Sequence, residues 1–249
     1  MKIVYTSKFI LKSLLGERAT GLFLVLASIF LVLSLSLSDI NIAVKYRLLE
    51  DALLASEGFI MLLAAVFYPF LLMEKDRKGG LFVFTLLGYK REKYLLSLFL
   101  ALFCLLFGIF VVFFVFDFLF LSAFADGMKT EFATKLFLGS FCASLLSFAV
   151  LTLARYVSNT NAIIYAIFLF FIGSGADELM LYAKEGGTIL QAVSYFIYYA
   201  LPNFSFFDPL STDTHGNKLS FAIFYFMIYG ALLYFAAYVR FKKEALKVG

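Results

Sequence analysis

The chain has 249 residues, of which 63% are apolar and only 15% charged, with a formal net charge of +4. A soluble domain carries about 45–50% apolar and about 25% charged residues, and so large an apolar surplus does not fit inside one core. The surplus must face lipid, which excludes an ordinary soluble domain and predicts an all-α integral membrane protein with no nucleic-acid partner.

Residues 2–18 precede the first apolar run and follow an amphipathic pattern. On a period of 3.6 residues the apolar side chains share one side, while lysine and hydroxyl side chains share the other. This pattern predicts a helix that lies in the headgroup plane of a bilayer. A cleaved signal peptide is the alternative, but the long patterned start and the later spans favour an uncleaved first helix.

Apolar runs long enough to cross a bilayer, which takes about 20 residues, recur along the rest of the chain. We expect about six spans in a single transmembrane domain covering 1–249. They are expected at about 21–38, 53–73, 94–123, 135–154, 162–182 and 220–239.

Residues 183–219 differ from the spans. Their apolar run, Ile189–Leu201, is too short to cross a bilayer and stops at Pro202, and a turn-rich tail follows. This segment predicts short re-entrant or interfacial helices in an outer excursion between the fifth and sixth spans. Pro202 and Asn203 would mark the end of the outer helix.

Basic residues predict the orientation. If the N-terminus is cytoplasmic, most of the 21 lysines and arginines fall in segments that face the cytoplasm. Because cytoplasmic loops are enriched in basic residues, both termini are expected inside. The predicted location is the inner (cytoplasmic) membrane of a bacterium, as a multi-pass protein.

The chain lacks the motifs of a nucleotide or metal site. No stretch matches GxxxxGK[ST], so a P-loop is excluded and any ATP must bind to another subunit. His215 is the single histidine, and Cys104 and Cys142 lie in apolar runs. We therefore expect no metal, no cofactor bound by this chain and no enzymatic activity of its own.

The segment from Glu74 to Lys93 is the candidate docking element for such a subunit. It is a short apolar stretch between two charge clusters, and it is too short to span. Its apolar residues would enter a groove on the partner. An ordinary basic loop that rests on lipid headgroups explains the pattern equally well. The candidate contacts are Glu74, Arg77, Gly79, Gly80, Leu81, Phe84, Leu87, Tyr89 and Arg91.

Three segments give the chain a resemblance to a known family. Glu74–Leu81 (EKDRKGGL) with Leu86–Leu96 (LLGYKREKYLL) resembles the loop after the second helix of ABC-2 type permeases. Ala154–Thr160 (ARYVSNT) is similar to the short basic turn between their fourth and fifth helices. Leu201–Asp208 (LPNFSFFD) is similar to a stretch in the branch linked to multi-copper enzyme maturation and nitrous-oxide-reductase assembly.

The resemblance implies the permease subunit of an ABC exporter. Such a chain pairs with a second copy of itself, or with a similar permease, on two ATP-binding subunits that hold the ATP and magnesium. The resemblance adds Arg155 and Tyr156 to the docking contacts and implies that the N-terminal helix braces the partner. The apolar helices favour a lipid-like cargo, whereas the branch favours a small metal- or sulfur-related cargo.

Four residues are candidates for a substrate pathway. Asp117 is identified as the one acid well inside an apolar span, where carboxylates are costly, although the span's outer interface is expected near it and would leave it wet. Asp177, Glu178 and Tyr198 lie near the outer mouth, where a solvated helix end or an interface anchor explains them as well. A stand-alone secondary transporter and a non-transporting scaffold subunit remain alternatives.

Overall fold

A computed structural model describes residues 2–18, 21–22, 25–26, 29, 45–76, 91–124, 128–185, 187–207 and 216–245. These residues form eight α-helices and one short 3-10 helix, with no strand among them. The prediction of an all-helical chain is therefore confirmed for the described residues, and four of the helices are long and apolar enough to cross a membrane.

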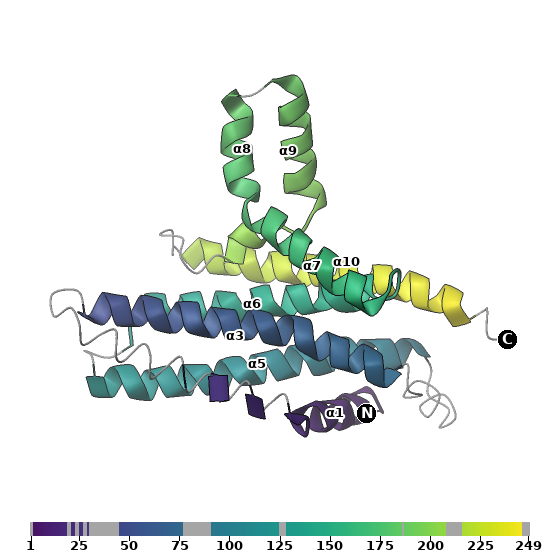
Figure 1. Ribbon diagram of the computed structural model, residues 1–249, viewed down its shortest axis with the longest axis horizontal. Coiled ribbons are helices and arrows are strands. Elements are labelled where there is room, and N and C mark those ends of the chain that lie inside the picture. Colours follow the sequence, from purple (N-terminus) through teal and green to yellow (C-terminus); the bar gives the residue numbers. More distant parts are fainter. Residues whose placement is uncertain are drawn as a thin grey trace.

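Four long helices lie side by side and form a bundle (Figure 1): α3 (Lys45–Lys75), α5 (Arg91–Phe124), α6 (Thr130–Leu153) and α10 (Gly216–Ala245). Helix α6 is central and contacts α3, α5 and α10. Almost every residue from Ser140 to Thr152 is buried, because this helix is apolar or small on all sides. Small side chains on α6 allow its neighbours to approach closely.

Rings of phenylalanine join three of these helices. Phe148 of α6 lies 4.9 Å from Phe99 of α5 and 5.9 Å from Phe226 of α10, measured between ring centroids. Phe226 also lies 4.8 Å from Phe141. Aromatic pairs at such distances add to the stabilisation from burial, so some of the 34 phenylalanines of the chain serve helix packing.

The described spans agree with most of the predicted ones. Four helices are long and apolar enough to cross a membrane: Leu49–Lys75, Glu92–Ala123, Thr130–Leu153 and Leu219–Lys243. They correspond to the predicted spans at 53–73, 94–123, 135–154 and 220–239. The predicted span at 21–38 lies mostly outside the described residues, so it stays a prediction.

The segment predicted as a fifth span, 162–182, is not one straight helix. It divides into α7 (Asn159–Ser174) and α8 (Ala176–Glu185), which meet at Gly175 with a bend of 51°. Ser158 caps the start of α7, because its hydroxyl accepts a hydrogen bond from the Asn161 backbone N–H. Together the bent pair is apolar enough to count as one broken span.

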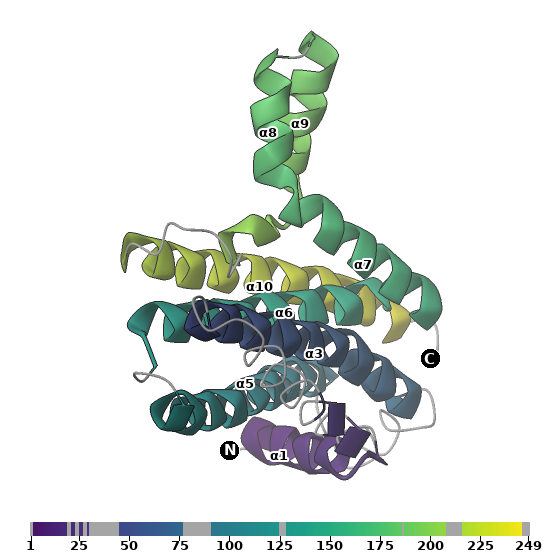
Figure 2. The same cartoon turned by 60° about the vertical axis from the view of Figure 1, so that its left-hand side comes forward.

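Helices α8 and α9 (Thr188–Ala200) form a hairpin that begins inside the predicted fifth span, 162–182, and continues into the predicted outer excursion. Figures 1 and 2 show that the hairpin projects sideways, across the direction of the long helices. The chain then returns to the bundle through the 3-10 helix η2 (Phe204–Phe207), whose Phe204 and Phe207 are buried. The hairpin itself exposes large apolar side chains, including Ile189 and Phe196.

The N-terminal helix α1 (Lys2–Leu15) packs along the first turns of α5. Ile10 and Leu14 are buried there, and Lys75 at the end of α3 forms an ion pair of 2.5 Å with Glu17. The Lys75 Nζ atom also donates a hydrogen bond to the Ser13 hydroxyl at 2.6 Å. These contacts fix the start of the chain to one end of the bundle.

Candidate functional site

The two ends of the bundle carry different polar groups. We call the end that holds Arg155, where α3 ends and α5 begins, the basal end. The opposite end, where α3 begins and α6 follows Lys129, is the distal end.

A buried ion pair lies at the basal end. The Nη1 atom of Arg155, in the turn between α6 and α7, is 3.0 Å from Oδ2 of Asp76, which directly follows α3. Only 12% of the arginine side chain and 8% of the aspartate side chain are exposed. Tyr94 at the start of α5 donates its hydroxyl to Oδ1 of the same carboxylate at 3.1 Å. Asp76 therefore connects three helices.

Helix α10 closes the same cluster from the other side. The Arg155 guanidinium lies 4.9 Å from the ring centre of Phe241, which is within the range of a cation–π contact. Arg240 donates from Nε to the Arg155 backbone carbonyl at 3.1 Å, and Tyr156 donates to the Ala236 carbonyl at 2.8 Å. These contacts hold the α6–α7 turn against α10.

The predicted docking residues that the structure describes lie at the basal end. Arg155 is largely buried, whereas Tyr156 is 49% exposed. Glu74 is half-buried near the end of α3, and Arg91 begins α5. The remaining candidate contacts lie outside the described residues: Arg77, Gly79, Gly80, Leu81, Phe84, Leu87 and Tyr89.

A pair of carboxyl groups is buried between α3 and α5, toward the distal end. Asp117 of α5 has no exposed surface and Glu57 of α3 has 4%. The two groups are close enough to interact directly with each other. Glu57 Oε2 and both carboxyl oxygens of Asp117 have no hydrogen-bond partner among the described residues.

This burial corrects two sequence-based expectations. Asp117 is not a wet acid at the interface, because α5 continues to Phe124 and turns the carboxyl group toward α3. It is also not the one acid inside a span. Glu57, eight residues into the Leu49–Lys75 segment, is a second one that sequence reasoning missed. Its position inside an apolar run was the signal that could have identified it.

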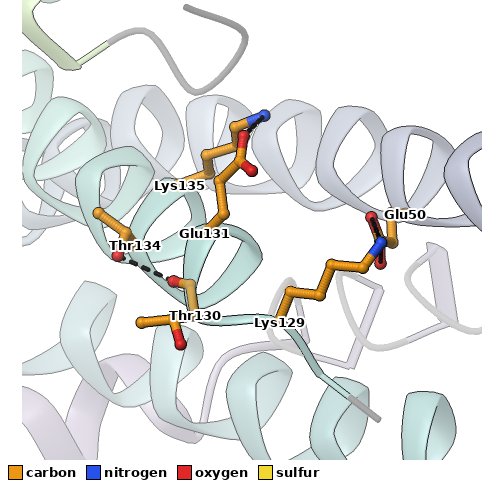
Figure 3. A network of polar contacts seen from close by, with 6 residues as sticks. All are labelled: Glu50, Lys129, Thr130, Glu131, Thr134 and Lys135. Atoms are coloured by element: carbon orange, nitrogen blue, oxygen red, sulfur yellow. Dashed lines mark hydrogen bonds and ion pairs between the residues drawn. The ribbon is translucent and has the colours of Figure 1, made fainter. Parts of the chain in front are cut away.

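A polar pocket of about 360 Å³ opens at the distal end, and Leu54 is the lining residue nearest to Glu57 in sequence. Lys129 lies 3.1 Å from Glu50, and Lys135 lies 3.0 Å from Glu131 one turn earlier in α6 (Figure 3). The full lining is Glu50, Asp51, Leu54, Lys129, Glu131, Phe132 and Lys135.

The remaining predicted pathway residues gather where the hairpin joins the bundle. Asp177 accepts hydrogen bonds from the Ser205 hydroxyl at 2.6 Å and from the Asn203 amide at 3.4 Å. The Asn203 backbone N–H donates to the Tyr225 hydroxyl at 2.6 Å. Pro202 and Asn203 are buried, so they anchor the hairpin.

Tyr198 and Glu178 belong to the hairpin. Tyr198 of α9 is half-buried, and partial burial, helped by the charge of Asp177, raises the pKa of its phenol. Glu178 is exposed on α8. Of the predicted pathway residues, Asp177 and Tyr198 are therefore close enough to interact, whereas Asp117 belongs to a separate buried pair.

No group of three or more histidine, cysteine or acidic side chains that could hold a metal ion occurs among the described residues. An apolar groove of about 360 Å³ runs between α5, α6 and α10, lined by residues that include Phe103, Phe148 and Gly230.

No model of a known protein family matches the chain, and no curated protein matches it in sequence.

Proposed function

We propose that the chain is the permease subunit of an ABC exporter in a bacterial inner membrane, with its basal end toward the cytoplasm. The observation that carries the proposal is the buried contact between Asp76 and Arg155. It joins the start of 77–90, the part of the proposed docking segment Glu74–Lys93 that follows Asp76 and precedes α5, to the turn that the ABC-2 resemblance adds to the same docking surface.

The C-terminal end of that segment is also connected to Asp76. Arg91 begins α5 immediately after it, and Tyr94 binds Asp76. A partner that pushes on residues 77–90 would therefore act on α3 and α5 together. Arg155 and Arg240 extend the connection to the α6–α7 turn and α10. Polar contacts of this kind are suited to carry a movement from a docked subunit into the spans.

The expected partners follow from the absence of a P-loop in the sequence. Two ATP-binding subunits would supply ATP and magnesium, and a second copy of this chain, or a similar permease, would complete the assembly. Helix α1, fixed to α3 through Lys75, would brace the ATP-binding subunits. Closure of those subunits would favour one of two bundle arrangements and so switch access across the membrane.

The apolar groove between α5, α6 and α10 is lined by aromatic and aliphatic side chains. Such a surface suits a lipid-like or amphiphilic molecule better than a free ion. The resemblance to the copper- and nitrous-oxide-related branch favours a small metal- or sulfur-related cargo instead.

Deleting Leu81–Leu87 tests the proposal, since it removes the apolar part of the docking segment. We expect the ATP-binding subunit to lose its association with the purified permease and ATP hydrolysis to become independent of transport. A matched control is Leu181→Ser on the hairpin, where the leucine is already exposed. Coupled transport that survives the deletion would show that these residues do not dock the partner.

A second candidate function, a stand-alone cation-coupled transporter, is favoured by the buried Glu57–Asp117 pair. Secondary transporters place ionisable groups inside the membrane along ion pathways. This candidate requires transport by the purified chain in liposomes without any ATP-binding subunit. Transport that depends strictly on ATP and on a partner would eliminate it.

A further inference from the structure

The apolar groove between α5 and α10 has α6 at its base. Both outer helices pack against α6. Gly230 leaves space between them, because it lies four residues from Phe226 and four from Tyr234 on one face of α10 but carries no side chain. A Cβ atom on Gly230 would already lie 3.6 Å from the ring of Phe148 on α6. The groove is therefore open because a small residue interrupts a row of aromatic ones.

Aromatic pairs hold the floor of the groove in place. Phe103 of α5 lies 5.7 Å from Phe226 of α10, and Phe99 lies 5.5 Å from Tyr234, measured between ring centroids. Both pairs connect α5 to α10, and such pairs favour their own geometry, so the groove keeps its shape without a ligand. Apolar walls that pack against nothing lose dispersion contacts, which favours an apolar occupant.

The length and the depth of the groove suit one lipid tail. From Leu96 to Phe103 on α5, and from Phe226 to Tyr234 on α10, the helix axis advances by about 10–12 Å. The hydrocarbon of one leaflet is about 15 Å thick, which is half of the bilayer core. Leu96 lies one turn beyond Glu92, where the apolar segment Glu92–Ala123 begins. The groove therefore lies in the leaflet at the basal end of the bundle.

Charged and polar side chains of both signs lie at the basal mouth of this groove. Tyr238, whose ring stacks on that of Tyr234 at 6.4 Å, donates its hydroxyl to Glu92 Oε1 at 3.0 Å. Glu92 is exposed, so its carboxylate can also accept a hydrogen bond from a ligand. Two exposed lysines are close in sequence: Lys93 follows Glu92 in α5, and Lys242 lies one turn beyond Tyr238 in α10. This combination matches a headgroup that carries both a cation and an anion.

We propose that the groove binds one phospholipid of the surrounding bilayer with a primary ammonium headgroup, as in phosphatidylethanolamine. One acyl chain packs against Phe148, the ammonium donates a hydrogen bond to Glu92, and the lysines at the mouth attract the phosphate. A quaternary ammonium has no N–H to donate, and an anionic headgroup without an ammonium offers no cation to the carboxylate. The site goes beyond the proposed transport function and does not depend on it, because binding requires no ATP-binding subunit.

The test compares three lipids that differ in the headgroup alone. The full-length chain, purified in detergent, is titrated with phosphatidylethanolamine, phosphatidylcholine or phosphatidylglycerol of identical acyl chains, and native mass spectrometry counts the lipids retained. We expect one saturable phosphatidylethanolamine per chain, at a lipid concentration about tenfold below that for phosphatidylcholine, since a charge-assisted hydrogen bond contributes about that factor. No retained lipid, equal binding of all three, or a preference for phosphatidylglycerol would overturn the proposal.

A headgroup variant assigns the ammonium contact. Glu92→Gln removes the charge of the acceptor, so phosphatidylethanolamine and phosphatidylcholine should bind to this variant alike. Glu131→Gln at the distal end is the matched control and should keep the preference of the unaltered chain. A preference for phosphatidylethanolamine that survives Glu92→Gln would overturn the assignment of the headgroup site.

A second variant tests the groove itself. Ala231→Phe places a ring in the groove and should abolish the saturable retention of each lipid, whereas Leu232→Phe, at the next residue, which is 56% exposed and does not line the groove, should bind as the unaltered chain does. If Ala231→Phe fails to fold, the headgroup comparison on the unaltered chain and on Glu92→Gln still decides the matter. A lipid-free dimer that Ala231→Phe dissociates would show that a second copy fills the groove, and it would overturn the proposal.

Discussion

The Asp76–Arg155 pair makes a strong prediction about stability. In Arg155→Met the Asp76 carboxylate keeps, among the described residues, the hydrogen bond from Tyr94, in a site where 8% of its side chain is exposed. Removing one partner of a buried ion pair costs about 3–5 kcal/mol, because the other charge stays buried without compensation. The cation–π contact with Phe241 is lost as well. We therefore expect the free energy of unfolding to fall by an amount near the upper end of that range.

The same reasoning predicts the behaviour of the double variant. Asp76→Leu together with Arg155→Met replaces both charges by apolar groups, which is often neutral or even stabilising. The double variant should therefore be more stable than the single Arg155→Met variant. The assay is denaturant or thermal unfolding of the purified chain in a mild detergent. Glu131→Gln breaks an ion pair within one turn of α6 whose glutamate side chain is 52% exposed, and it serves as the control, with an expected change of about 0.5 kcal/mol or less.

Two outcomes would refute this account. A loss below about 1 kcal/mol in Arg155→Met would mean that water or another group replaces the guanidinium, since exposed pairs contribute about that much. A double variant that loses as much as the two single variants added together would mean that the side chains act independently. Either result would remove the connection on which the docking surface is built.

Three further predictions concern other parts of the fold. Gly173→Ala should lower the free energy of unfolding by about 1–3 kcal/mol, because the added Cβ atom would lie 2.2 Å from the Pro202 carbonyl oxygen. Gly108→Ala is the control in the same unfolding assay. Its Cβ atom meets no atom within 4 Å, so this substitution should be neutral or slightly stabilising. Asp117→Asn should raise the thermal midpoint of unfolding, because a neutral amide costs less to bury than a carboxylate. Ser205→Ala removes a hydrogen bond to Asp177 and should speed protease cleavage within the hairpin, while an unchanged rate would mean that this contact does not hold it.

The long spans could be predicted because their signal is local. About 20 continuous apolar residues suffice to identify a helix that crosses a bilayer, and α3, α5, α6 and α10 each contain such a run. The bend between α7 and α8 could not be found in this way. Gly175 interrupts an apolar segment of suitable length, but a glycine in such a segment is also compatible with a continuous helix.

The polar contacts were beyond sequence reasoning for a different reason. Asp76 and Arg155 are 79 positions apart in the sequence, and their meeting depends on how α3 and α6 pack. The facing of Glu57 and Asp117 depends likewise on the rotation of two helices about their axes. In each case the sequence identifies charged residues in or beside apolar runs, but only the packed bundle shows which of them meet.

The central claim is that this chain is a permease driven by a separate ATPase. Co-purification from the native membrane tests this claim most directly. The detergent-solubilised chain is captured by affinity purification, and its companions are identified and quantified by mass spectrometry. The account predicts a P-loop ATPase at about one copy per permease chain, lost when Leu81–Leu87 are deleted. A homogeneous preparation of this chain that transports cargo in liposomes with no ATPase present would contradict it.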